Sequence, residues 1–299
     1  MRPVTSSERV LDSPPSLLPL FARSAAALIP GTSRLPFIGG GGGREIPELT
    51  LTLPSVRVER ERLVAYDRVC GFSLSDTLPP TYIHILAFPL HLKLMSERSF
   101  PFRAIGLVHI ANKISQHRHV NAAEELSLRV VPTALEPHPR GRQFSLRTEA
   151  RVGEELVWEE VSTILKRGAG SAGPSGPVAR PSTDELPVTA TWKLRGDLGR
   201  RYASVSGDIN PIHMHPLSAK LFGFPSAIAH GMWTKARCLA ALEGRLPAAF
   251  TVEVSFRRPI VLPAMVGFAQ APASEGGVRF SVRDARKSTP HLAGSAKFG

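Results

Sequence analysis

Residues 202–242 have the sequence YASVSGDINPIHMHPLSAKLFGFPSAIAHGMWTKARCLAAL, and the interpretation of the whole chain starts from them. An acid, an amide and an imidazole lie close together there as Asp208, Asn210 and His213. A second polar turn, residues 229–232, then opens an apolar helix. No other stretch combines so many reactive side chains with so many residues that restrict the backbone. We therefore expect the functional site here and a scaffold in the rest of the chain.

The backbone around Asp208 is predicted to bend sharply. Pro211 fixes its own φ and disfavours helix at Asn210, so the segment from Asp208 to His213 cannot form one continuous helix. Gly207 allows an unusual backbone angle just before the acid. A bent loop of this kind can direct Asp208 and His213 into one cleft, where a carboxylate and an imidazole near one water are suited to general acid–base chemistry. Asn210 is then a supporting residue.

Two other interpretations of these polar residues are structural. Asp208 and Asn210 can instead serve only to accept hydrogen bonds from backbone amides in an Asx turn. His230 is expected to bond the backbone. Gly231, in contrast, heads a helix whose first amides lack partners and carry partial positive charge, and it has no side chain to block them. It is predicted to bind a substrate carbonyl oxygen.

The first half of the chain carries a degenerate copy of this stretch. Residues 66–72, YDRVCGF, match residues 202–208, YASVSGD, in their Tyr, Val and Gly. Further on, Pro79 with His84 has the spacing of Pro225 with His230. A chance match of short apolar helices is the alternative to an internal duplication.

The differences between the two copies bear on the number of sites. Phe72 stands where the second half has Asp208, and Ile85 stands where it has Gly231. The segment that corresponds to Asn-Pro-Ile-His is missing from the first copy. We therefore predict one site per chain, in the second half.

Both halves are predicted to contain a short helix, a longer apolar helix and a series of strands, which is an α+β pattern with helices segregated from an antiparallel sheet. Residues 1–44 are assigned to an N-terminal extension with an amphipathic helix near residues 17–28. The Gly-, Ser- and Pro-rich stretch 168–187 is assigned to a linker between a first domain, 45–167, and a second, 188–299. Predicted helices cover 57–69, 83–95, 198–205 and 232–242, and predicted strands cover 49–53, 106–114, 124–132, 142–152, 156–166, 188–194, 251–256, 263–272, 278–284 and 291–298.

Composition limits the classes of function. The chain has 299 residues, 42% hydrophobic and 21% charged, with a net charge of +12, which is a globular composition with a basic surface. Such a surface attracts polyanions, but no zinc-knuckle spacing or RNA-recognition signature is present. His109, His117 and His119 show no ligand spacing with a carboxylate or cysteine, so no metal site is expected. Cys70 and Cys238 are expected to be buried thiols in a reducing compartment. No stretch is long and apolar enough to cross a membrane, so a cytoplasmic protein is expected.

The motif Tyr-x-x-Val-Ser-Gly-Asp-x-Asn-Pro-Ile-His, followed by Ala-His-Gly-Met at the head of a helix, resembles the MaoC-like, (R)-specific enoyl-CoA hydratases and 3-hydroxyacyl-thioester dehydratases. The resemblance is strongest over residues 186–299. The length of the chain, its linker and its degenerate first copy resemble those family members that contain two hot-dog domains. It implies a double hot-dog fold, two antiparallel sheets each wrapped around a long helix, whose halves pair as two subunits would. The family's acid–base pair falls on Asp208 and His213, its thioester-binding amide on Gly231 and a supporting residue on Asn210.

The implied activity is the reversible conversion of a trans-2-enoyl thioester and water into the (R)-3-hydroxyacyl thioester in fatty-acid metabolism. The substrate is bound to CoA or to acyl carrier protein, and no metal or redox cofactor is needed because the thioester itself acidifies the α-carbon. The family's Phe-x-x-Pro pattern falls on residues 256–259, which include Arg257 and Arg258 as candidate contacts to substrate phosphates. The chain is expected to be a monomer with pseudo-dimeric halves or a homodimer. Alternatives are a non-catalytic protein that binds acyl thioesters, an acyl-CoA thioesterase and a nucleic-acid binder.

Overall fold

The two copies of the Tyr-x-x-Val-x-Gly frame form the same element in the computed structural model of the chain. Helix α2 (Arg60–Cys70) ends at Gly71, and helix α4 (Leu198–Ser206) ends at Gly207. Both glycines are left-handed, with φ of 82° and 78°, and the amide of each bonds a carbonyl in the preceding turn. A residue with a Cβ is strained in this conformation, so the shared glycine is explained by the helix end. The two helices pack together, and Arg62 Nε of α2 donates to the carbonyl of Val205 in α4 at 2.9 Å.

The structure describes residues 7–26, 41, 43–170, 186–274 and 276–299, without the side chains of residues 23–26. The chain divides into two compact units. Unit 1 contains residues 1–57, 84–109 and 124–176, and unit 2 contains residues 58–83, 110–123 and 177–299. Two segments from the first half of the sequence therefore belong to the same unit as the second half. The sequence boundaries 45–167 and 188–299, and the linker 168–187, stay a prediction.

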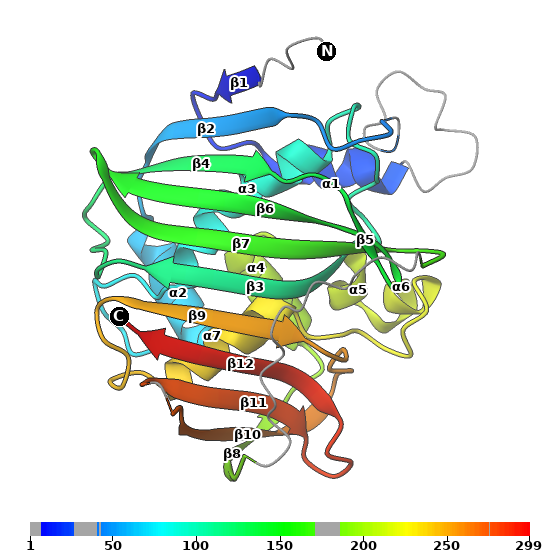
Figure 1. The fold of residues 1–299 in the computed structure, drawn as a ribbon. Coiled ribbons are helices and arrows are strands. Elements are labelled where there is room, and N and C mark those ends of the chain that lie inside the picture. The colour runs from blue at the N-terminus through cyan, green and yellow to red at the C-terminus, as the bar shows by residue number, and fades with distance from the viewer. Residues whose placement is uncertain (1–6, 27–40, 42, 171–185, 275) are drawn as a thin grey trace. The chain divides into compact units, whose positions relative to one another are not determined.

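Unit 1 is built on strands in the order β1-β2-β4-β6-β7, with β5 on β6 (Figure 1). Helix α3 (Tyr82–Met95) has 14 residues and is almost entirely apolar, although Pro89 lies inside it. The buried side chains of unit 1 alternate along its strands, as in residues 141–152, where one face packs inward. The elements are β1 (Ser7–Val10), α1 (Leu17–Ala26), β2 (Leu49–Val56), β4 (Leu126–Pro132), β5 (Glu136–His138), β6 (Gly141–Val152) and β7 (Glu155–Arg167).

Unit 2 is built on strands in the order β3-β9-β12-β11-β10-β8, all antiparallel (Figure 1). Strand β9 pairs on one side with β3, where Ala111 faces Ser255, and on the other with β12. The elements are β3 (Val108–Gln116), β8 (Val188–Leu194), α5 (Pro211–Met214), α6 (Pro216–Leu221), α7 (Gly231–Ala241), β9 (Phe250–Phe256), β10 (Ala264–Pro272), β11 (Val278–Asp284) and β12 (Pro290–Phe298).

The predicted α+β architecture is confirmed, and most predicted elements end within a few residues of their observed bounds. The extension, residues 1–44, differs from the prediction because it contributes strand β1, which pairs parallel to β2. Its sequence SERV is too short to stand out as a strand by pattern alone. The short strand β5 was also not predicted. Residues 39, 40 and 42 and most of the linker lie outside the described residues.

Both cysteines are buried free thiols, as predicted. Cys70 ends α2 and Cys238 lies in α7, and each side chain is fully buried. Burial raises the pKa of both thiols far above the ordinary value, because the thiolate loses its solvation. Neither cysteine is therefore suited to act as a nucleophile.

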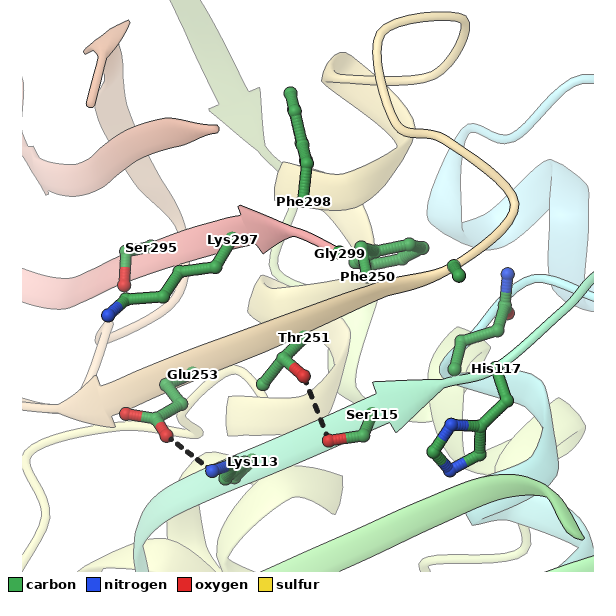
Figure 2. A pocket seen from close by; sticks show the side chains of 12 residues that line it. Lys113, Ser115, His117, Phe250, Thr251, Glu253, Ser295, Lys297, Phe298 and Gly299 are labelled. Atoms are coloured by element: carbon green, nitrogen blue, oxygen red, sulfur yellow. Dashed lines mark hydrogen bonds and ion pairs between the residues drawn. The ribbon is translucent and has the colours of Figure 1, made fainter. Parts of the chain in front are cut away.

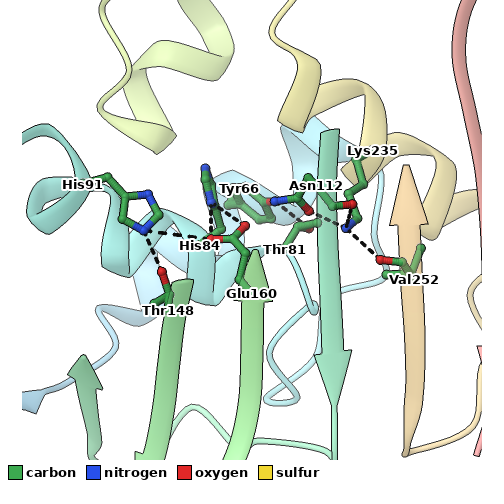
Figure 3. Close-up of polar contacts among 9 residues, drawn as sticks. All are labelled: Tyr66, Thr81, His84, His91, Asn112, Thr148, Glu160, Lys235 and Val252. Carbon is green, nitrogen blue, oxygen red and sulfur yellow. Dashed lines mark hydrogen bonds and ion pairs between the residues drawn. The ribbon is translucent and has the colours of Figure 1, made fainter. Parts of the chain in front are cut away.

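Helix α7 is fastened to the sheet of unit 2 by a buried lysine. Lys235 has no exposed surface, and its Nζ donates to Asn112 Oδ1, to the Asn112 carbonyl at 3.4 Å and to the Val252 carbonyl at 3.3 Å (Figure 3). Asn112 lies in β3 and Val252 lies in β9, so one ammonium group joins the helix to two neighbouring strands. Three oxygens thus share one buried donor.

Lys235→Met is expected to lower the free energy of unfolding by about 1–3 kcal/mol, because it removes a buried ammonium donor that three oxygens share. Urea denaturation followed by circular dichroism measures the change. Lys235→Met combined with Asn112→Leu should recover part of the loss, since the amide acceptor is then absent as well. Lys193→Met, on an exposed part of β8, is the control and should stay within about 0.5 kcal/mol of the wild type. An equal effect of both lysine substitutions would contradict this role for Lys235.

Candidate functional site

Asp208 follows directly on the end of α4. Gly207 turns the chain out of the helix, and the backbone amide of Asp208 donates to Ser206 Oγ at 3.2 Å. Ser206 is buried, whereas Asp208 is partly exposed. The helix end and this hydroxyl therefore fix the backbone of the acid while its carboxylate stays open to a ligand. No role was predicted for Ser206, which lies just beyond the predicted helix 198–205.

The loop after Asp208 is an Asx turn followed by a capped helix. The amide of Asn210 donates to Asp208 Oδ1 at 3.2 Å, and the amide of Ile212 donates to Asn210 Oδ1 at 3.5 Å. Asn210 is the N-cap of α5, and Pro211 occupies the first turn of that helix. One carboxylate oxygen of Asp208, Oδ1, thus accepts a backbone hydrogen bond, as in an Asx turn. The other, Oδ2, lies 3.8 Å from His230 Nε2, so one face of the carboxylate points toward the histidines.

His213 is held in one tautomer by the backbone. Its Nδ1 donates to the Ile228 carbonyl at 2.8 Å, so Nε2 carries the lone pair. The side chain is buried, and burial lowers the pKa of His213 below its ordinary value of 6.5, while the nearby Asp208 charge and the bond to Ile228 oppose the shift. The ring is therefore neutral at pH 7 and offers Nε2 as a proton acceptor.

His230 lies against both residues. Its Nε2 donates to the Asp208 carbonyl at 3.0 Å, which confirms the prediction that it bonds the backbone. Its ring stacks on that of His213 with a centroid distance of 3.6 Å. Burial, and then the proximity of His213, lower the pKa of His230 well below its ordinary value, so this ring is also neutral. His230 thus ties the backbone of the acid to the ring of the second predicted catalytic residue.

Asp208, His213 and His230 form a compact group of three polar side chains. One donor atom from each lies within 4.8 Å of the others, a separation that is also compatible with a metal ion. Each histidine uses one ring nitrogen to donate to a backbone carbonyl, which fixes the orientation of its ring. The absence of a metal from this site stays a prediction.

Gly231 is the first residue of α7 and packs under an aromatic ring. A Cβ at this position would lie 3.0 Å from Cε1 of Phe256, which is closer than ordinary contact. Glycine at this position therefore also avoids a clash with the Phe256 ring, in addition to leaving its amide open as predicted from the sequence. The N-cap residue, His230, makes no side-chain bond to the first turn of α7, so the N-terminal amides there are not capped by it.

Arg257 and Arg258 follow Phe256 at the end of β9. The amide of Arg257 donates to the His291 carbonyl at 2.8 Å, and the carbonyl of Arg258 accepts from His291 Nδ1 at 3.0 Å. The Arg258 side chain is exposed, and that of Arg257 is half-buried. Their place next to Phe256 brings their backbone near the start of α7. A contact of either side chain with substrate phosphate stays a proposal.

Gly199 supports the site from inside α4 and was not predicted. A Cβ at this position would overlap the backbone carbonyl of His213. Only glycine allows α4 and α5 to approach closely enough for His213 to reach Ile228. No spacing rule signals this, because the two segments meet only in the folded chain.

Gly199→Ala is expected to destabilise the fold by about 1–3 kcal/mol, because overpacking forces α5 away from α4. It should also lower catalytic activity by displacing His213. Gly196→Ala is the matched control, since Gly196 lies just before the same helix and a Cβ there would meet open space. Thermal unfolding measures the stability of both variants, and the loss of the enoyl absorbance of crotonyl-CoA in the ultraviolet measures their activity. Equal behaviour of the two alanine variants would contradict a supporting role for Gly199.

A shallow pocket on unit 2 lies apart from these residues (Figure 2). Its volume is about 410 Å³, and strands β3, β9 and β12 line it. Its polar groups pair with one another across the sheet, as Lys113 Nζ with Glu253 Oε1 at 3.1 Å and Ser115 Oγ with Thr251 Oγ1 at 3.0 Å. None of the predicted site residues lines it.

Comparison with known proteins bears on the family of the chain. The family model described as MaoC like domain matches residues 177–273. The chain is 34% identical to 3-hydroxyacyl-thioester dehydratase X of Mycobacterium tuberculosis over 284 residues, which cover 95% of this chain and 98% of the relative. It superposes on the crystal structure of HtdX of Mycobacterium tuberculosis with a TM-score of 0.75 and 35% identity, over 84% of this chain and 100% of that one.

A further solved structure bears on the fold alone. A Mycobacterium tuberculosis protein with a double hot-dog fold matches with a TM-score of 0.51 and 13% identity, over 82% of this chain and 93% of that one. The double hot-dog architecture that the sequence predicted is thereby confirmed. Within the described residues, no helix is long and apolar enough to span a membrane.

Proposed function

The chain belongs to the MaoC-like family, and from this we propose that it is a hydro-lyase that reversibly adds water to a trans-2-enoyl thioester to give the (R)-3-hydroxyacyl thioester. One observation carries the proposal. The Asp208 carboxylate and the neutral ring of His213 lie together beside His230, which is the N-cap of α7, and Gly231 follows as the first residue of that helix. An acid–base pair beside a helix N-terminus is what hydration of an α,β-unsaturated thioester requires.

In the hydration direction, Asp208 and His213 hold one water molecule between them. The Nε2 lone pair of His213 is available to take a proton, because Nδ1 donates to Ile228. As the water oxygen bonds to C3, its O–H bond breaks and the electron pair of the C2=C3 double bond moves onto the thioester oxygen. His213 then gives a proton to C2, either directly or through Asp208. Dehydration follows the same steps in reverse.

The developing negative charge on the thioester oxygen is assigned to the amide of Gly231. Amides in the first turn of a helix have no intrahelical acceptors, and the helix dipole places positive charge there. Loss of one such donor typically costs about 10²–10³-fold in rate. Because the thioester itself acidifies C2, these residues account for the reaction without a redox cofactor, and this too is part of the proposal.

The substrate is an acyl thioester of CoA or of acyl carrier protein. Both carry phosphate on the arm that leads away from the thioester, and the net charge of +12 favours the binding of such anions. Arg257 and Arg258 are the proposed phosphate contacts, since they follow the strand that ends against Gly231. We propose a cytoplasmic enzyme that is a monomer with pseudo-dimeric halves or a homodimer.

A series of trans-2-enoyl-CoA substrates from crotonyl-CoA upward tests the function. Loss of the enoyl absorbance in the ultraviolet reports hydration, and chiral analysis of the product should give the (R) isomer. A parallel assay of free thiol with DTNB should show no release of CoA. Binding without turnover at every chain length would favour a non-catalytic protein, and thiol release would favour a thioesterase.

A further inference from the structure

Unit 1 contains a second buried group of polar side chains, apart from the residues used above. His84 and His91 lie about two turns apart on α3 and so on the same face of that helix. Glu160 comes from strand β7 and lies between them (Figure 3). All three residues are buried, at 7%, 3% and 1% exposure. The proposed hydratase chemistry does not involve any of them.

The three side chains converge through atoms that bind metals. His84 Nδ1 lies 2.8 Å from Glu160 Oε1 and 3.0 Å from Oε2, and His91 Nε2 lies 4.0 Å from Oε2. One donor atom from each residue lies within 4.8 Å of the other two. Zinc ligands at about 2.0–2.2 Å from the ion in a tetrahedral site are about 3.3–3.6 Å apart. The two histidine–carboxylate separations, 2.8 and 4.0 Å, lie on both sides of this value, so each would change by less than about 1 Å. The separation between the two histidine nitrogens lies within 4.8 Å and would have to reach about the same value.

We propose that His84, His91 and Glu160 bind a zinc-type divalent cation that fastens helix α3 to strand β7. Two imidazoles with one carboxylate form a donor set suited to zinc and the other late first-row ions rather than to magnesium or calcium, which prefer oxygen ligands. Three protein ligands leave one position of a tetrahedral ion for water. All three residues are buried and the proposed hydratase chemistry does not use them, so the proposed role is structural and hydratase activity does not pass through the ion.

Thr148 of β6 adds a further polar group to the cluster. Its hydroxyl lies 2.7 Å from His91 Nε2 (Figure 3). His91 Nε2 can bind the ion only after this hydrogen bond breaks. The released hydroxyl can then bond a water molecule that serves as the fourth ligand.

The competing explanation is a buried imidazole–carboxylate pair that shares a proton between His84 and Glu160. That pair accounts for the 2.8 Å contact, and Thr148 accounts for His91, whose Nε2 lies 2.7 Å from the hydroxyl and 4.0 Å from the carboxylate. A bound cation would instead place both imidazoles on one ion together with the carboxylate, so the metal content of the protein distinguishes the two explanations.

The test uses the full chain. Protein stripped with a chelator is incubated with zinc, passed through a desalting column and analysed for metal by mass spectrometry. We expect about one equivalent of zinc per chain and a higher melting temperature than the stripped protein, because binding to the folded state stabilises it. Cobalt added in place of zinc should give the visible absorption of a tetrahedral site.

Variants and crystallography place the ion. Asp208→Asn combined with His213→Gln removes the other cluster that could bind a metal, and this variant should still bind about one equivalent of zinc per chain. Glu160→Gln and His91→Gln should weaken binding by at least about 10–100-fold. Because these buried variants can fail to fold, anomalous diffraction at the zinc edge on the wild type decides independently. A peak among His84, His91 and Glu160 supports the site. Zinc-treated protein that retains no metal, or an ion found elsewhere, overturns it.

Discussion

Asp208→Asn is expected to lower kcat/KM for enoyl-CoA hydration by about 10²–10⁴-fold, the usual contribution of a positioned acid or base. The substitution keeps the size of the side chain and an oxygen to accept from the Asn210 amide, so the turn should persist. What it removes is the negative charge and the basic oxygen that faces the histidines. The ultraviolet assay with crotonyl-CoA, or with the best longer substrate, measures the loss.

Asp197→Asn is the matched control for this variant. Asp197 is the N-cap of α4, at the other end of the helix that leads to Asp208, and its side chain makes no capping bond. Its carboxylate pairs instead with Arg195, whose side chain is exposed. The control should keep nearly full activity. Full activity of Asp208→Asn, with a normal melting temperature, would remove Asp208 from the mechanism.

His213→Gln is expected to cause a loss of similar size, about 10²–10⁴-fold in kcat/KM, because it removes the neutral ring nitrogen that accepts the proton. The amide nitrogen of Gln can still donate toward the Ile228 carbonyl, so folding should be retained. His215→Asn is the control. That histidine lies two residues further on, is exposed and caps α6, a role for which Asn is well suited.

The pH dependence of the wild type gives a second measure of His213. Burial lowers the pKa of His213 below 6.5, so the base form persists as the pH falls through 6.5 and is lost only further down, near the lowered pKa. The acid limb of the kcat/KM profile should therefore lie below pH 6.5 and should be absent in His213→Gln. Stability follows the same sign. The neutral ring contributes stability that is present above pH 6.5 and is lost as the pH falls toward the lowered pKa. If the acid limb of the kcat/KM profile is unchanged in His213→Gln, a group other than His213 causes that limb.

The local sequence was enough to predict most of the secondary structure and to predict that Asp208 and His213 lie close together. Gly71 and Gly207 end helices because only glycine adopts the required backbone angle cheaply, and Pro211 forces the bend after Asp208. These are effects of neighbouring residues, which spacing reveals. The predicted family is confirmed by a relative that is 34% identical over nearly the whole chain.

The parts that were missed depend on contacts between distant segments. Gly199 is needed because His213 passes directly over α4, and the ring of Phe256 explains why Gly231 has no side chain. His84 and Glu160 meet only because β7 packs against α3 in unit 1. None of these pairs has a sequence spacing that predicts it. The roles of Asp208, Asn210, His213, Gly231 and the two arginines stay predictions until the variants are measured.

Strand β3 has a consequence for aggregation. Residues 110–123 belong to the unit that holds the candidate site, and Ala111–Gln116 pair with Ser255–Phe250 of β9. A fragment cut at the predicted linker, residues 188–299, would lose that partner and expose the backbone donors and acceptors of β9 as a bare sheet edge. Such an edge recruits strands from other molecules. We expect the fragment to self-associate or precipitate, whereas the full chain supplies its own strand to protect this edge.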